Sequence, residues 1–441
     1  MMFKTIVNAF RIKEIRTKLL YTIVMLIIVR IGCQIPLPGT DASVVEEVLG
    51  DLTSSGFGFF NAMTGSSFSS MSIFALNITV YITATIIMQL LTIAFPALEE
   101  MQREGEDGRQ KMAKITRYVT LGLALIEAAA MTIGFGNQGI FGSITGAEYV
   151  WTIICDICVL VAGAMLIMWM GEQITDNGVG NGISIILLIN IVSTMPSDFI
   201  TLYQQFVAGA SSVGMAVLSA LIIIAVVVVV VAFIVYLSGG ERKIPVQYSQ
   251  KMSANGRAYG GRTSYIPLKV NTAGVIPIIF AASLFQFPII IASFAGASDA
   301  EWTKYFSSSY WCDPSNIKYS AGLIIYLALI IFFAYFYTQI TFNPMTVADN
   351  IKRQGGFVPG VRPGKATELY FARILKYQIF VGAVGLCIVT LIPMIVSGVF
   401  NASLSFAGTS IIIVVGVILE TAKQLESMML VRNYDGFLAK D

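Results

Sequence analysis

Ten stretches of mostly apolar residues divide the 441-residue chain, and most of them are close to the about 20 residues that an α-helix needs to cross a bilayer. Their bounds are 19–38, 72–95, 115–135, 150–171, 182–196, 213–237, 271–294, 319–343, 374–399 and 402–424. Charged residues make up only 12% of the chain, against about 25% in a soluble domain. Because lipid cannot satisfy the free edges of an open sheet, we predict an all-α polytopic membrane protein with ten transmembrane helices.

The basic residues predict the orientation of these spans. Five of them, from Lys4 to Lys18, precede a full-length span, so no cleavable signal peptide is expected. Twenty-five of the 28 Lys and Arg fall on one side, and the exceptions are Lys304, Lys318 and the intramembrane Arg30. The positive-inside rule therefore places both termini in the cytoplasm. Two long basic loops, 238–270 and 343–373, would project from the same face.

Several enzyme classes are excluded by residue usage. The chain has no His, which rules out a Ser-His hydrolase, a His-ligated metal site and a His pH switch. Cys155 and Cys158 form a C-x-x-C inside an apolar span without a second pair, which is typical of packing and not of a redox or zinc site. There is no phosphate-binding loop, and no paired aspartates in a G-x-G-D context support an intramembrane protease. We expect no enzyme activity and no cofactor.

The ten spans divide naturally into two halves, residues 1–200 and 201–441, each with five helices. Many secondary transporters consist of two such halves related as an inverted repeat. A transporter of a small solute is therefore the main alternative to a channel. It predicts a midplane pocket lined by charged groups.

Charged residues well inside the spans are few, and such residues are usually functional because burying them in lipid is costly. They are Arg30, Glu127 and Asp156, on three different spans with no visible coordinating pattern. Arg30 is expected to extend toward the interface or to pair with an acid. Asp156 has no assignment.

Proline and glycine predict irregular spans. Pro277 and Pro288 each remove a backbone donor and favour kinks in the seventh span. Four glycines in GEQITDNGVGNGISIILL (171–188) predict a tight reversal between the fourth and fifth spans. The fifth span then meets Pro196 after about 14 residues, which corresponds to about 21 Å of helix. Short and bent helices predict a water-accessible funnel.

Residues 60–91, FNAMTGSSFSSMSIFALNITVYITATIIMQLL, join a polar, serine-rich dozen to the second span without a strong turn. Irregular polar backbone is tolerated at membrane depth only where protein or water surrounds it. The polar part is therefore either a re-entrant segment in the funnel or an amphipathic helix on the outer surface.

Six long motifs then resemble, in the same order, those of the SecY family of bacterial protein-translocation channel subunits. They are IPLPGTD (35–41), SIFALNITVYITATIIMQLL (72–91), GEQITDNGVGNGISI (171–185), RKIPVQY with YGGRTSYIPLKVNTAGVIPIIFA (242–281), FNPMTVADNIKRQGGFVPGVRPGKATELY (342–370) and GTSIIIVVG (408–416). The resemblance implies an hourglass pore that passes unfolded secretory polypeptides across the cytoplasmic membrane of a bacterium. It also implies lateral release of transmembrane segments into lipid.

The resemblance implies an apolar ring at the waist of the pore, hereafter the ring. Its members are Ile78, Ile82, Ile183, Leu187, Ile279 and Ile413, with Leu187 where isoleucine is usual. Ile78/Ile82 and Ile183/Leu187 are i,i+4 pairs, so each pair shares a helix face. An apolar constriction gates by excluding water. Without the resemblance, such residues are ordinary lipid-facing or core side chains.

The resemblance also makes residues 57–70 a re-entrant plug helix, hereafter the plug segment. Its candidate residues are Phe60, Asn61, Met63, Thr64, Gly65, Ser66, Ser67 and Phe68. The chain departs from the family at Ser66, where a second glycine is usual, and at Ser70, where arginine is common in some members.

A lateral gate is implied between spans 2 and 3 on one side and spans 7 and 8 on the other. Thr83, Glu127 and Asn271 match its polar positions, with Phe287 nearby, and many relatives have glutamine in place of Glu127. Polar contacts between membrane helices contribute only about 0.6–2 kcal/mol each, which suits a gate that opens. The alternative is a static interhelical hydrogen bond.

The implied partners are the small membrane subunits SecE and SecG, the SecA ATPase, the ribosome, signal sequences with secretory or nascent polypeptides, and lipid. Motor and ribosome contacts match Arg362, Lys352 and Arg353 in one basic loop and Arg257 in the other, where Gly256 departs from the usual pair of arginines. Phosphate-rich RNA would attract these loops. Alternatively, the basic loops only set the topology.

Overall fold

The computed structural model describes residues 10–40, 44–45, 58–136, 140–141, 146–208, 213–248, 251–252, 258–259, 263–294, 300–307, 310–312, 317–400 and 409–438. Long helices follow the ten predicted spans in order. They are α2 (Lys13–Gly32), α5 (Thr79–Ala94), α7 (Glu106–Gly136), α8 (Ala147–Asn177), α9 (Gly182–Leu202), α10 (Val213–Gly239), α11 (Ile276–Phe294), α12 (Ser320–Thr341), α14 (Lys365–Phe400) and α15 (Thr409–Leu438).

Several of these helices are long and apolar enough to cross a membrane. Among the described residues, α7, α8, α9, α10, α12 and α14 meet that requirement by length and composition, which makes six. A seventh span results if α5 is joined to α6 (Pro96–Arg103), which follows it after a bend of 108°. The all-α polytopic architecture is confirmed.

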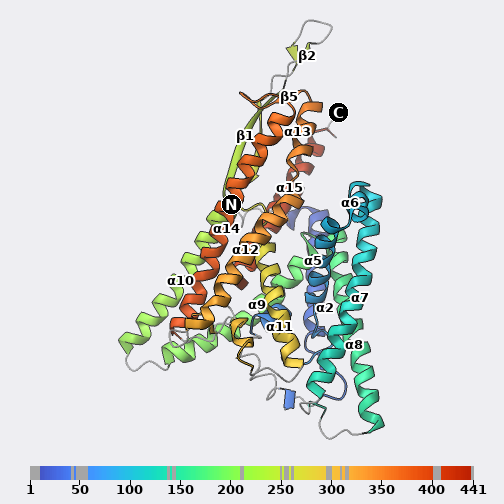
Figure 1. Cartoon of the computed structure of the whole chain (residues 1–441), viewed down its shortest axis with the longest axis vertical. Helices are drawn as coiled ribbons and strands as arrows, with labels where there is room; N and C mark the ends of the chain where they lie inside the picture. Colours follow the sequence, from blue (N-terminus) through green and yellow to red (C-terminus); the bar gives the residue numbers. More distant parts are fainter. Residues whose placement is uncertain are drawn as a thin grey trace.

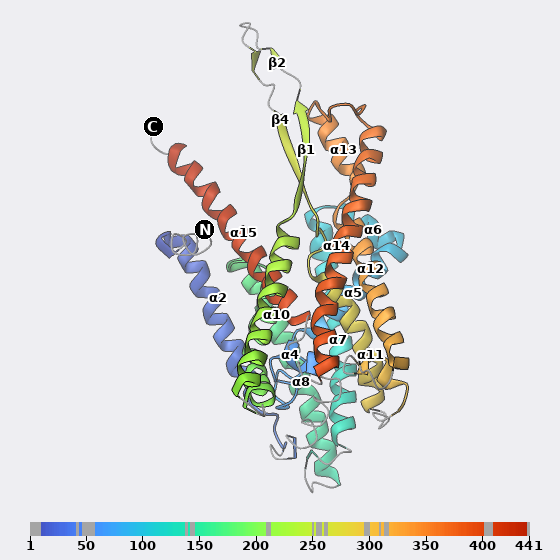
Figure 2. The same cartoon turned by 90° about the vertical axis from the view of Figure 1, so that its left-hand side faces the viewer.

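The helices pack as an elongated bundle whose long axis is roughly that of the helices (Figure 1). A β-hairpin and the short helix α13 (Pro344–Arg353) stand at one end of the bundle. Viewed from the side, α2 and α15 diverge from the other helices, and the start of α2 and the end of α15 point toward the hairpin end (Figure 2). The described start of α2 and end of α15 therefore lie toward the same end of the bundle.

Three buried clusters make up most of the core. One lies within residues 37–164 and another within residues 230–412. The third takes side chains from α2, α5, α8, α9, α11 and α15 and so joins the other two. The candidate site lies in this joining cluster.

The second, fifth and seventh spans depart from the local structure predicted for them. The second span begins as a helix at Thr79 and not at residue 72, because residues 65–78 form turns. The predicted short fifth span is wrong, since α9 continues through Pro196 to Leu202 and into a π-helix, Tyr203–Ala208. If the helix ended at Pro196, backbone groups in an apolar setting would lack hydrogen-bond partners. This cost favours a helix that continues through the proline. In α11, Pro277 lies in the first turn, where no hydrogen bond is lost, and only Pro288 is interior.

The two basic loops form one structural unit. In the first, β1 (Glu241–Tyr248) pairs antiparallel with β4 (Thr263–Lys269), a hairpin that the sequence analysis missed; the short strands β2 (Lys251–Met252) and β3 (Ala258–Tyr259) also pair. The second loop adds β5 (Gly356–Phe357), which pairs with the end of β1. Ile244 and Val246 of β1 are buried with Ile351, Val358 and Phe371 of the second loop and α14. The alternation of buried and exposed residues along β1 explains why this segment is a strand.

Candidate functional site

The six ring residues come together in the structure. Ile78 lies at the start of α5 and Ile82 inside it, and both are buried. The other four come from three helices far apart in the sequence: Ile183 and Leu187 on α9, Ile279 on α11 and Ile413 on α15. Five of the six are buried and Ile183 is partly buried, and all six belong to one packed cluster. A seven-residue helix, α4 (Gly58–Thr64), adds Met63 to the same cluster.

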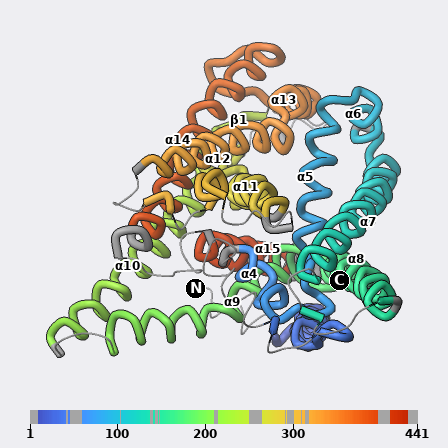
Figure 3. The backbone as a smooth tube through the Cα atoms, turned by 60° about the horizontal axis from the view of Figure 1, so that its bottom comes forward, coloured from blue at the N-terminus to red at the C-terminus, as the bar shows by residue number. Residues whose placement is uncertain are grey.

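The plug segment is inside the bundle. The short helix α4 contacts α9 and α15, and an oblique view with the bottom of the bundle turned forward shows it beside them (Figure 3). Phe60 packs edge-on against Phe68 with ring centroids 5.0 Å apart, and Phe68 packs against Phe135 of α7 at 5.8 Å. Burial on this scale rules out the alternative of an amphipathic helix on the outer surface.

Serine and threonine make the plug segment compatible with burial. The Ser67 hydroxyl donates to the Thr64 carbonyl at 2.8 Å, and both residues are fully buried. The Asn61 side-chain oxygen accepts from the Ser69 amide at 3.2 Å. Hydroxyl and amide side chains of this kind supply local partners to the backbone in place of a helix. The polar composition therefore satisfies the backbone of a tightly turned segment and does not require water.

A left-handed turn ends α4. Gly65 (φ 67°) and Ser66 (φ 66°) are both in the left-handed region. The Ser66 amide donates to the Asn61 carbonyl at 2.9 Å and the Gly65 amide to the Ala62 carbonyl at 3.1 Å. These two bonds form the Schellman arrangement that commonly ends helices at glycine. Ser66 occupies a conformation that costs a non-glycine residue roughly 1–2 kcal/mol.

Polar side chains from three other elements surround the end of this turn. Arg30 of α2 donates to the Gly65 carbonyl at 3.2 Å and to the Asn190 side-chain oxygen at 3.5 Å. The Asn190 amide donates to the Asn77 side-chain oxygen at 3.0 Å, and the Asn77 amide donates to the Thr64 carbonyl at 3.1 Å. Of the two roles expected for Arg30, pairing with an acid is not seen among the described residues, where the side chain donates to neutral acceptors.

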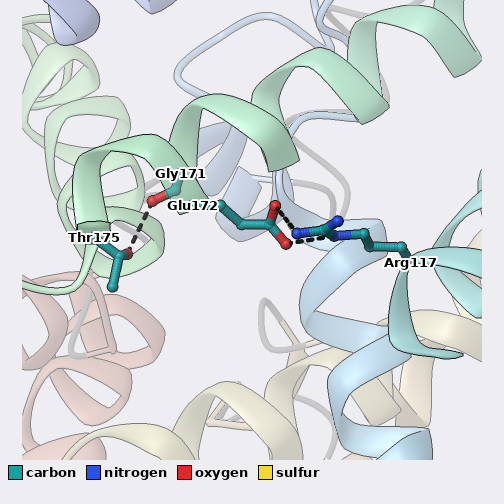
Figure 4. Close-up of polar contacts among 4 residues, drawn as sticks. All are labelled: Arg117, Gly171, Glu172 and Thr175. Carbon is teal, nitrogen blue, oxygen red and sulfur yellow. Dashed lines mark hydrogen bonds and ion pairs between the residues drawn. The ribbon is translucent and has the colours of Figure 1, made fainter. Parts of the chain in front are cut away.

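The start of α9, which carries Ile183 and Leu187, is fixed by a close approach to α8. A Cβ on Gly182 would overlap the Gly171 carbonyl, so the helices meet at two glycines. The Thr175 hydroxyl donates to the Gly171 carbonyl at 2.9 Å and accepts from the Gly182 amide at 2.9 Å. Next to Gly171, Glu172 forms a two-point ion pair with Arg117 of α7, at 2.7 and 3.0 Å (Figure 4). The predicted tight reversal between spans 4 and 5 is present at residues 178–181.

The four candidate gate residues are not joined by hydrogen bonds. The Thr83 hydroxyl donates to the Thr79 carbonyl of its own helix at 3.0 Å, and no hydrogen bond connects it with Glu127 or Asn271. Helix α11 nevertheless contacts α5 and α7, where Ile289 packs against the cluster that contains Ala124 and Ala128. The static interhelical hydrogen bond is thus absent among these described side chains.

Phe287, the fourth gate candidate, lies in a groove that the other three candidates do not line. It lines an apolar groove of about 460 Å³ with Trp302 and Phe306 and with residues of α12. Its side chain is 41% exposed. No residue of α5 or α7 lines that groove.

The loop candidates are exposed. Lys352 and Arg353 lie in the last turn of α13, and Arg362 follows β5. The Arg362 carbonyl accepts the Thr367 hydroxyl at 2.8 Å, which fixes the turn into α14. Arg257 lies outside the described residues.

Sequence reasoning missed Asn77 and Asn190. Both are 1% or less exposed, and Asn77 has φ 47°. The available signal was one asparagine within each of two otherwise apolar runs, FALNI and LLINIV. Asp156 is also fully buried, and neither of its carboxylate oxygens has a hydrogen-bond partner among the described residues. The same part of the chain holds no group of three or more acidic, Cys or His side chains that suits a metal.

Comparisons with known proteins match this arrangement. The sequence profile of the SecY family matches residues 72–422. The protein translocase subunit SecY of Streptomyces galbus is 39% identical, covering 99% of this chain and 100% of the relative. That of Bacillus subtilis strain 168 is 41% identical with the same coverage. The chain belongs to the SecY family.

Solved structures support the fold of this SecY family member. A structure described as that of a protein-conducting channel superposes with a TM-score of 0.65 at 20% identity, covering 93% of this chain and 92% of the other. A SecY structure concerned with the plug domain gives 0.63 at 19% identity and the same coverage. Sec61 from a canine ribosome-channel complex gives 0.62 at 18% identity, again with 93% and 92% covered.

Membership of the SecY family decides between the function classes. The chain is a protein-conducting translocation channel subunit of the multi-pass membrane type and not an enzyme. The alternative of a small-solute transporter is not supported.

Proposed function

We propose that the six ring residues form the constriction of the pore and that the structure represents a shut channel. The observation that carries the proposal is the single cluster in which side chains from α5, α9, α11 and α15 meet Met63 of α4. An apolar constriction excludes water and ions, whereas the aliphatic side chains of the ring, on separate helices, form no polar bonds with one another that a passing polypeptide would have to break.

The plug segment occupies the space next to this constriction. Its burial against α9 and α15 and the shared Met63 support that role. One of the SecY structures with the same fold is described as showing that the plug domain stabilises the closed state and maintains a membrane seal. We assign the corresponding role to residues 57–70 here.

Lateral release would require α5 and α7 to separate from α11 and α12. The contacts of α11 with α5 and α7 are apolar at Ile289, and Thr83, Glu127 and Asn271 do not bind one another. A seam whose described polar candidates form no hydrogen bonds with one another opens at low cost when a hydrophobic signal helix competes for it. The seam also separates the proposed halves, residues 1–200 and 201–441.

The joined basic loops are proposed as the docking platform for the translocation partners. Shared packing of β1, β5 and α13 holds Arg362, Lys352 and Arg353 on one rigid unit. A relative with the same fold comes from a ribosome-channel complex. We infer binding to the ribosome and to a SecA motor there, with SecE and SecG as membrane subunits, in the cytoplasmic membrane of a bacterium with both termini in the cytoplasm.

The test of the constriction is a pair of polar substitutions. Ile82→Asn combined with Ile279→Asn should increase export of a precursor with a defective signal sequence, because a wetter ring is easier to open. Ile224→Asn with Ile324→Asn is the matched control, since these side chains are 64% and 69% exposed on α10 and α12. Unchanged export of the defective precursor in the ring variant would contradict the assignment.

A further inference from the structure

A closed chain of hydrogen bonds lies between the plug segment and the ring. It connects Arg30, Asn190 and Asn77 with the carbonyls of Thr64 and Gly65. These carbonyls belong to the end of α4, where a helix leaves acceptors without intrahelical partners. The plug segment is thus held through its own backbone by side chains from α2, α9 and the entry to α5.

The same side chains are next to ring residues. Asn77 directly precedes Ile78, and its side-chain oxygen also accepts from the Ile78 amide at 2.8 Å. Asn190 lies on α9 three residues after Leu187, within one helical turn of it. The Asn190–Asn77 hydrogen bond, at 3.0 Å, therefore spans the two helices that contribute four of the six ring residues.

We propose that Arg30, Asn77 and Asn190 form a polar latch that retains the plug segment and links its release to the separation of α5 from α9. The inference deepens the proposed function and rests on it. Widening the ring by moving α5 away from α9 breaks the Asn77–Asn190 bond. Asn77 and Arg30 then lose the geometry with which they hold Thr64 and Gly65.

Burial and charge make the latch effective in the shut state. Thr64, Asn77 and Asn190 are all 1% or less exposed, so water does not compete for their bonds. Arg30 uses one terminal nitrogen for both of its acceptors. Hydrogen bonds to a charged group are stronger than those between neutral groups, so Arg30 contributes most to retention.

The experiment measures halide efflux from liposomes that contain the purified chain with its co-purified membrane subunits and a halide-sensitive dye. Arg30→Lys keeps the positive charge but loses the planar guanidinium with its several hydrogen-bond donors. Asn77→Gly keeps the positive φ, and Asn190→Leu replaces the amide by an apolar group of similar shape. Each variant should leak faster than the parent, on the order of 10-fold for a lost buried hydrogen bond. Thr390→Val removes a buried hydroxyl on α14 that bonds only within its own helix, and it should not leak.

The double variant Asn77→Gly with Asn190→Leu tests the link between the two helices. Both single changes remove the Asn77–Asn190 bond, and each also removes a further bond, from Asn77 to the Thr64 carbonyl or from Arg30 to Asn190. Because the shared bond can be lost only once, the double variant should leak less than the product of the two single effects. Multiplied effects would overturn the coupling. Thermal denaturation in detergent confirms that each variant is folded.

Deletion of residues 60–68 separates failure of the latch from failure of the proposed function. If the deletion leaks and the three latch variants do not, the latch is wrong and the plug assignment stands. If the deletion itself does not leak, the plug assignment is wrong and the latch falls with it.

Discussion

Gly65 lies against the Arg30 guanidinium so closely that a Cβ at Gly65 would overlap Nη1 of Arg30 and come within 3.0 Å of the Asn190 Cα. The position also has φ 67°. Gly65→Ala should therefore loosen the plug segment by both a clash and a left-handed strain of roughly 1–2 kcal/mol. We expect faster halide efflux from proteoliposomes, by about 10-fold for each 1.4 kcal/mol.

Two matched substitutions separate these causes. Gly274→Ala introduces a side chain at φ 64° with nothing within 4 Å, far from the plug segment in sequence, and should leave efflux unchanged. Ser66→Gly removes a strained side chain at φ 66° and should lower efflux below that of the parent. Equal efflux from Gly65→Ala and the parent would show that this close approach does not hold the plug segment.

The Arg117–Glu172 pair should stabilise the α7–α8 contact modestly. The Arg117 and Glu172 side chains are 48% and 20% exposed, so solvent screens their attraction, although the guanidinium and carboxylate form two hydrogen bonds. A double-mutant cycle with Arg117→Gln and Glu172→Gln should give a coupling free energy of about 0.5–1 kcal/mol that falls with added salt. Denaturation in detergent at low and high salt measures it. A coupling that does not change with salt would contradict this description.

Arg362→Glu should reduce export driven by the ATPase motor, because it reverses an exposed charge on the proposed platform. Folding and membrane insertion should be preserved, since the fixed contact at this position is made by the backbone carbonyl. Arg109→Glu, an equal charge change at an exposed position of α7 outside the two basic loops, is the control. The measurement is the rate of precursor uptake into inverted vesicles with motor and ATP, and a normal rate for Arg362→Glu would refute its role.

Local sequence patterns predicted the long helices and the pairs of ring residues that share a helix face. The apolar stretches located ten long helices because a lipid environment dictates their length. The i,i+4 spacing of Ile78/Ile82 and Ile183/Leu187 correctly put each pair on one helix face, and the structure packs both pairs into one cluster. The role proposed for the cluster rests on the family motifs and not on the spacing.

Contacts between segments that are distant in the sequence could not be predicted from local patterns. Asn77 and Asn190 are 113 residues apart, and nothing near either asparagine indicates the other. The neutral partners of Arg30 include a backbone carbonyl, which no sequence motif marks. Pro196 was taken to end a helix by its intrinsic effect on the backbone, but the tertiary setting of α9 outweighs that effect.

The central claim is that the ring is the passage for polypeptides. A photo-crosslinking residue placed in turn at Ile78, Ile183 and the exposed control position Ile224 measures this directly, with a precursor stalled during transport. We predict crosslinks to the precursor from Ile78 and Ile183, and none from Ile224. Absence of crosslinks from both ring positions, with the precursor stalled in the same membranes, would contradict the account.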